Sequence, residues 1–94
     1  MNIKKFNTIG YFIKHYFNWS MGWSELESCI DDFLIRENEE SIEALKKEIE
    51  EMYMLNDSHL IREVAYRIGN RGMPADKALN MIKLLYIKTR KENK

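Results

Sequence analysis

The sequence predicts an all-α fold, a compact single domain over residues 1–94 that forms a bundle of about five helices. Two observations carry this prediction. Apolar residues recur at intervals of three and four along nearly the whole chain, and no segment shows the period-two alternation that a strand bounded by turns would require. A domain of 94 residues buries only roughly 60–65% of the surface that its unfolded chain exposes, so nearly every patterned apolar side chain is needed for the core.

The first helix is predicted over residues 6–17. Separations of three, four and three positions place on one helix face the residues Phe6, Ile9, Ile13 and Tyr16. Residues 18–22 break this pattern. A second helix is predicted to begin at Ser24, where Glu27, three positions later, would complete a capping box.

The remaining helices are bounded by capping and turn residues. Asn38 is a predicted N-cap, and the first turns after it hold carboxylates that favour the positive end of the helix dipole: Glu39, Glu40 and Glu43. Residues 56–58 indicate a break and a new cap. We expect the fourth helix to end at Gly69 as its C′ residue and the fifth to have Pro74 at its first position. Residues 88–94 are expected to form a frayed tail.

Net charge is zero, but the charges are segregated along the chain. Residues 1–24 carry a net charge of +3, residues 25–51 carry −8, Asp57 adds −1, and residues 58–94 carry +6. An acidic middle between basic ends indicates a charged partner.

The sequence has no catalytic or metal-binding pattern, so we expect that the protein is not an enzyme and binds no cofactor. His15 and His59 lie far apart, and a single cysteine beside them makes no zinc site. Cys29 falls on the apolar stripe of the second helix and is expected to pack as a small hydrophobe. Asp31 and Asp32 are adjacent, so on a helix they point about 100° apart and do not favour an acid/base pair.

The expected location is the cytoplasm. One cysteine allows no internal disulfide, which fits a reducing compartment. The N-terminus lacks the layout of a signal peptide, because Lys14 and His15 interrupt its apolar stretch. No apolar run approaches the roughly 18–20 residues that span a bilayer, so no membrane association is expected.

The acidic residues around the turn between the second and third helices are a candidate binding surface. We expect their carboxylates to meet there and to attract a basic groove: Glu25, Asp32, Glu39, Glu40 and Glu43. The alternative is a solvated helix face that keeps the protein in solution.

The aromatic segment is a second candidate, because tryptophan is enriched at the energetic centres of interfaces. For Trp19 and Trp23 a place in the core is the favoured interpretation, with Trp23 the nearer of the two to the rim. Trp23 is therefore included among the predicted partner-binding residues.

Two further functions stay open. A small DNA- or RNA-binding regulator is suggested by Ala65 and Gly69, which loosely match a helix-turn-helix, and by basic residues of the last third: Arg62, Arg67, Arg71 and Lys77. The same basic residues would also serve simply to balance the acidic helices. A scaffold domain that dimerises through exposed aromatic residues is the third possibility.

About half of the chain resembles a known family. The stretch runs from Ile9 to Tyr53 and has the order GYFIKHYFNW, a short break, WSELESCIDDFL, then ESIEALKKEIEEMY. This order is similar to that of the helical immunity proteins of contact-dependent growth inhibition systems, the CdiI type. The places that match the family pattern are Tyr16-Phe17, Trp19, Asp32-Phe33-Leu34 and the segment from Leu45 to Ile49.

The resemblance implies a function and a partner. Such bacterial proteins bind the C-terminal toxin domain of a delivered CdiA-type effector in the cytoplasm of the recipient cell, and the toxin is often a nuclease. Carboxylates would mimic substrate phosphates, and the bound protein would block the active site. We expect a monomer or weak dimer in isolation, with no direct contact to nucleic acid.

Overall fold

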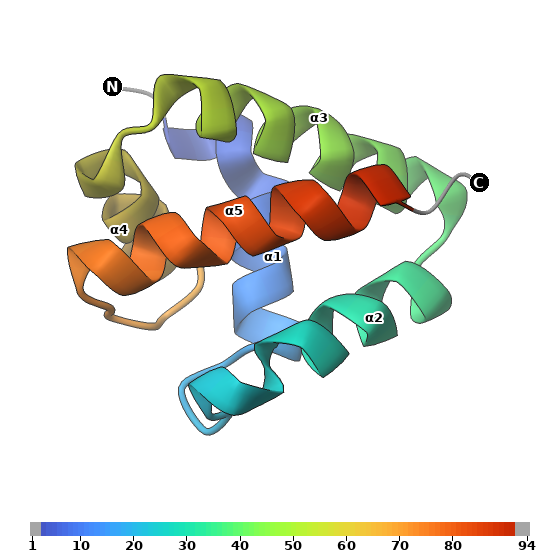
Figure 1. The fold of residues 1–94 in the computed structure, drawn as a ribbon, viewed down its shortest axis with the longest axis horizontal. Coiled ribbons are helices and arrows are strands. Elements are labelled where there is room, and N and C mark those ends of the chain that lie inside the picture. The colour runs from blue at the N-terminus through green and yellow to red at the C-terminus, as the bar shows by residue number, and fades with distance from the viewer. Residues whose placement is uncertain (1–2, 92–94) are drawn as a thin grey trace.

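The computed structural model describes residues 3–91, and the chain there is helical with no strand. Two short 3-10 helices accompany five α-helices: η1 (Ile3–Phe6), α1 (Asn7–Tyr16), η2 (Trp23–Glu25), α2 (Leu26–Arg36), α3 (Glu39–Leu55), α4 (Ser58–Arg67) and α5 (Ala75–Lys91). The predicted all-α fold of five helices is confirmed (Figure 1). Residues 1–2 and 92–94 lie outside the described part of the chain.

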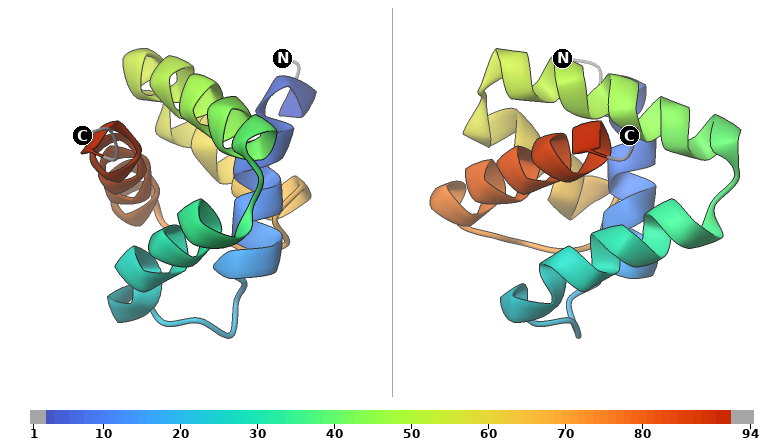
Figure 2. Two further views of the ribbon diagram at one scale, coloured as in Figure 1. Left: turned by 90° about the vertical axis from the view of Figure 1, so that its right-hand side faces the viewer. Right: turned by 45° about the vertical axis from the view of Figure 1, so that its right-hand side comes forward.

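Helices α1 and α5 hold the bundle together, because each packs against α2, α3 and α4. Figure 1 shows α5 in front of the bundle and α1 behind it, while the turned views of Figure 2 show α2 below and α3 above. Helices α3 and α5 run antiparallel. The helices enclose one apolar core, whose largest fully buried side chains include Phe6, Phe12, Phe17, Phe33, Ile49 and Met81.

Two predicted helix starts are confirmed by hydrogen bonds. The Asn38 side-chain oxygen accepts from Ser41 N at 2.8 Å and caps α3. The Asp57 carboxylate accepts from Leu60 N at 3.1 Å and caps α4. Both side chains satisfy backbone donors that have no partner within the first turn.

The predicted capping box of Ser24 and Glu27 is wrong. The chain forms η2 first, and α2 begins at Leu26. The carboxylate that reaches back to a backbone donor belongs to Glu25, which accepts from Gly22 N at 2.8 Å. Glu27 instead forms an ion pair with Lys88 at 3.2 Å.

Gly69 is the C′ residue of α4, as predicted, because the helix ends at Arg67 and Ile68 is its C-cap. The described glycines have no positive φ, and the chain becomes left-handed one residue later, at Asn70 (φ 59°). A Cβ at Gly69 would lie 2.7 Å from the Ile13 side chain and 2.9 Å from the Ala65 carbonyl oxygen. The glycine is therefore required by the close crossing of α1 and α4.

Helix α5 differs from its prediction at both ends. It begins at Ala75, so Pro74 precedes the first helical residue, and the Pro74 carbonyl accepts from Ala78 N at 2.9 Å. The frayed tail is wrong for residues 88–91, because the helix continues to Lys91. Lys88 pairs with Asp31 at 2.6 Å, and the buried Thr89 hydroxyl donates to the Leu85 carbonyl at 2.8 Å.

Candidate partner-binding surface

Three exposed carboxylates and one exposed apolar side chain lie in the segments that α2 and α3 bring to their two-residue link. We call this surface the α2–α3 corner and define it as Asp32, Ile35, Glu39 and Glu40. Only two residues separate the two helices. Within residues 3–91 no ion pair engages the three carboxylates. Ile35, which lies between Asp32 and Glu39 in the chain, is 80% exposed to solvent. The corner therefore combines three carboxylates outside these ion pairs with an apolar contact point, and Arg36 lines a hollow together with Asp32.

Two of the predicted acids lie elsewhere. Glu25 stands at the opposite end of α2, which is about 16 Å long, and its carboxylate is engaged with Gly22. Glu43 lies further along α3 and forms an ion pair with Lys46 at 3.7 Å. The expectation that all five carboxylates meet at one corner is thus wrong for these two.

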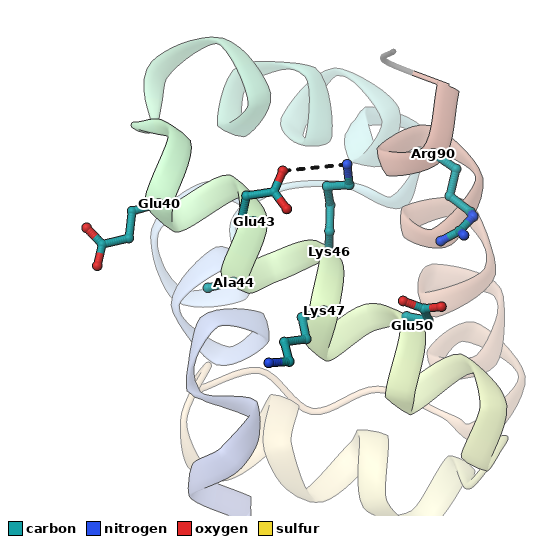
Figure 3. Close-up of a pocket in the computed structure, with 7 residues that line it drawn as sticks. All are labelled: Glu40, Glu43, Ala44, Lys46, Lys47, Glu50 and Arg90. Carbon is teal, nitrogen blue, oxygen red and sulfur yellow. Dashed lines mark ion pairs between the residues drawn. The ribbon is translucent and has the colours of Figure 1, made fainter. Parts of the chain in front are cut away.

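A hollow of about 600 Å³ next to the corner has mixed charge. Figure 3 shows Glu43 turned toward Lys46, with Lys47 and Glu50 further along α3 and Arg90 reaching in from α5. Glu40 points away from these residues. Since three acids and three bases line the hollow, it does not extend the negative surface.

The basic ends of the chain neutralise part of its acidic middle. Lys5 pairs with Glu51 at 2.5 Å, and Lys88 pairs with both Glu27 and Asp31. These ion pairs join segments far apart in sequence. The corner carboxylates lie outside these ion pairs.

The two tryptophans are placed differently from the prediction. Trp19 is 77% exposed, so a core position is wrong for it. Trp23 is half-buried and packs edge-on against Phe17, with ring centroids 4.9 Å apart. Trp23 also lines a groove of about 360 Å³ between η2 and α5, away from the corner; Leu26, Lys77, Asn80, Lys83, Leu84 and Ile87 complete it.

A tyrosine pair holds the link between α2 and α3. The Glu37 carboxylate accepts from the Tyr16 hydroxyl at 2.5 Å and from the Tyr11 hydroxyl at 2.9 Å. The bond from Tyr16 is the main reason that the pKa of Glu37 lies below its usual range, and burial together with that bond raises the pKa of Tyr16 to about 12. The link is fixed, so the corner has a defined shape. Sequence reasoning missed Glu37, whose only local signal is its place in a short link.

Arg71 is a structural residue that the sequence placed on a nucleic-acid surface. It is buried, and its Nη1 donates to the carbonyls of Phe17 at 3.1 Å, Asn18 at 2.8 Å and Met21 at 3.0 Å. The guanidinium lies 4.0 Å from the Phe17 ring centroid, and burial lowers its pKa. Arg71 cannot contact a phosphate without leaving this site.

The other basic residues of that alternative also have partners in the protein. Arg62 Nε donates to the Met73 carbonyl at 2.9 Å, and Arg67 pairs with Glu63 at 2.7 Å. The Lys77 ammonium lies 5.5 Å from the Trp23 ring centroid. The basic third is thus partly occupied by internal contacts.

The reactive side chains lie apart. Cys29 is buried, as predicted, and its burial raises the pKa of the thiol. His15 and His59 are exposed on different helices. Across residues 3–91 no cluster of three or more His, Cys, Asp and Glu side chains is arranged to hold a metal ion. No helix of this part of the chain has both the length and the apolar character needed to cross a membrane.

The fold and the surface define a small all-α protein with an exposed acidic corner. Comparisons with protein-family models, with curated proteins and with solved structures give no match to this chain.

Proposed function

We propose that this chain is an immunity protein that binds and neutralises the toxin domain of a contact-dependent growth inhibition effector in the cytoplasm. The observation that carries the proposal is the α2–α3 corner, where three carboxylates without an ion pair within residues 3–91 accompany an exposed isoleucine. The resemblance of residues 9–53 to helical immunity proteins supports the same function.

The corner fits a basic protein groove of the kind that a nuclease uses to hold phosphates. Complementary charge raises the association rate and selects the partner. Ile35 supplies apolar area that a partner can bury, because it is already exposed. In this proposal the protein blocks the active site of the toxin by occupying it and performs no reaction itself.

The test uses the C-terminal domain encoded by the reading frame immediately upstream. We expect the purified domain to bind this chain tightly and to lose its nuclease activity when bound. Binding is measured by surface plasmon resonance at several salt concentrations, and activity by cleavage of DNA and RNA. A domain that cleaves equally well with this chain in excess contradicts the proposal.

The corner itself is tested by the double variant D32K/E40K. Because charge steers the encounter, we expect the association rate to fall at least about tenfold and its salt dependence to flatten. The matched control is E50K/D76K, which makes the same charge change at exposed positions. Asp76 is the second residue of α5, as Glu40 is the second residue of α3. Equal association rates for the two double variants would place the binding surface elsewhere.

A further inference from the structure

An exposed tryptophan stands on the loop between α1 and η2. The Trp19 side chain is 77% exposed, although a chain this short needs its large apolar residues for the core. We call residues 17–22 the Trp19 loop. Tryptophan is the residue type most enriched at the energetic centres of protein interfaces.

The backbone on both sides of Trp19 is held in place. Arg71 donates to the carbonyls of Phe17, Asn18 and Met21, which bracket Trp19 in the chain. The guanidinium also lies against the rings of Phe17 and Trp23, at 4.0 and 4.8 Å from their centroids. A buried cation thus joins the α4–α5 connection to this loop.

The loop is also closed from within. The Asn18 side-chain oxygen accepts from Ser20 N at 2.9 Å and from the Ser20 hydroxyl at 2.5 Å. Met21 N donates to the Asn18 carbonyl at 2.8 Å. These bonds form a tight turn with Trp19 at its tip. The loop backbone is therefore ordered while the indole faces solvent.

The Trp19 loop adjoins α2 at Asp32 and Arg36. Asn18 and Met21, which lie before and after Trp19 in the loop, line a hollow of about 370 Å³ together with Asp32 and Arg36. Asp32 belongs to the α2–α3 corner. One protein partner that covers the corner would therefore also meet the Trp19 loop.

We propose that Trp19 is the energetic anchor of the interface and that it inserts into an apolar pocket rimmed by basic groups on the toxin domain. This inference rests on the proposed function and names its central contact. Arg71 is a positioning residue, because it holds the loop in the bound shape before the partner arrives. Pre-ordering the anchor reduces the conformational entropy lost on binding.

The first test replaces Trp19 by Ala and measures affinity for the upstream-encoded domain. A central anchor predicts a loss of at least about thirtyfold. Tyr66→Ala and Met54→Ala are the matched controls, because these side chains are 68% and 76% exposed on other helices. Each control is expected to change affinity by less than about threefold. A W19A variant that binds like the controls overturns the inference, whereas a wild type that does not bind overturns the proposed function itself.

The second test asks whether Arg71 acts through Trp19. Arg71→Met removes the three hydrogen bonds and keeps an apolar stem over Phe17. We expect it to weaken binding by at least about fivefold in the wild-type background and by less than about twofold in the W19A background, a coupling that a double-mutant cycle resolves. Equal losses in both backgrounds would leave Arg71 with a purely structural role and contradict the positioning claim.

A third measurement, on the protein without its partner, tests whether Arg71 orders the Trp19 loop. In a Trp23→Phe background Trp19 is the single tryptophan, so its fluorescence anisotropy decay reports motion of the loop. We expect Arg71→Met to increase the amplitude of fast motion on the nanosecond timescale. An unchanged decay would show that the loop is ordered without Arg71.

Discussion

Single residues decide how closely the helices approach. Gly69 and Gly10 lie where α1 crosses α4, and at each a Cβ would collide with an isoleucine of the facing segment, Ile13 and Ile68 respectively. Both glycines are buried. The absence of a side chain therefore sets the distance between the two helices.

Gly69→Ala is expected to lower the free energy of unfolding by about 1–3 kcal/mol, because the new methyl group overpacks a closed site. The measurement is urea denaturation followed by circular dichroism. Gly72→Ala is the matched control, since no atom lies within 4 Å of a Cβ placed there. Its effect should stay within about 0.5 kcal/mol. Similar losses for both variants would refute the close-crossing explanation.

Tyr16 gives a second prediction at the scale of one residue. Its pKa is raised from 10.0 to about 12, chiefly by burial and then by the hydrogen bond to Glu37. Because the folded pKa lies above the unfolded one, this group contributes stability below pH 10 that is lost as pH rises toward 12. The hydrogen bond to Glu37 also raises the pKa of Tyr11. Tyrosinate absorbance should therefore show late-titrating tyrosines, of which the latest is missing in Tyr16→Phe. Titration of all tyrosines together, near the ordinary value, would contradict the contact.

At the scale of elements, α1 is capped by a different helix. It has no side-chain cap of its own, and the Glu48 carboxylate of α3 accepts from Ile9 N at 2.9 Å. Burial raises the pKa of Glu48. A cap supplied across an interface ties the start of α1 to the middle of α3.

Glu48→Ala is expected to cost about 1–2 kcal/mol of stability, because it leaves buried backbone donors unpaired. Glu48→Gln keeps an acceptor oxygen and should cost less. Burial raises the pKa of Glu48 in the folded protein, so the stability that this group contributes is lost as pH rises through that pKa and the carboxyl ionises. Glu48→Gln has no proton to lose and should therefore flatten the dependence of stability on pH in this range. Thermal unfolding at several pH values measures both effects. Equal losses for Ala and Gln would exclude the capping role.

At the scale of the whole molecule, basic residues from the ends of the chain form ion pairs with acidic residues from its middle. Lys88 of α5 is mostly buried between Glu27 and Asp31 of α2, and Asp31 is the main reason that the pKa of Lys88 is raised. The pairing fastens the last helix to the second one. It also explains why part of the acidic middle is unavailable to a partner.

Lys88→Met is expected to lower stability by about 1 kcal/mol, since it leaves two carboxylates without their cation. Lys83→Met on the same helix is the control and should change stability by less than about 0.5 kcal/mol, because Lys83 is exposed. The difference between the variants should shrink in high salt. Chemical denaturation at low and high ionic strength makes the comparison. Equal stability losses for Lys88→Met and Lys83→Met at low salt would show that the Lys88 ion pairs do not stabilise the fold.

The candidate site was predictable only in part. Asp32 lies on α2, and Glu39 and Glu40 lie on α3, on the two sides of the two-residue link; that their carboxylates converge stays a prediction. Glu25 lies at the other end of α2 and Glu43 lies further along α3, and their carboxylates contact Gly22 N and Lys46 respectively. Sequence spacing fixes which face of a helix a carboxylate occupies, but competing donors decide where it points.

The sequence by itself determined the five helices and the starts of α3 and α4. The periodicity of three and four and the caps at Asn38 and Asp57 involve residues within one or two turns, so they can be deduced from neighbouring residues. The burial of Cys29 follows from its place on the apolar stripe of α2. Only the tertiary structure decided that Trp19 is exposed, that Arg71 is buried and that Gly69 serves a helix crossing. Each of these depends on which distant segment lies opposite, and that is settled when the helices pack.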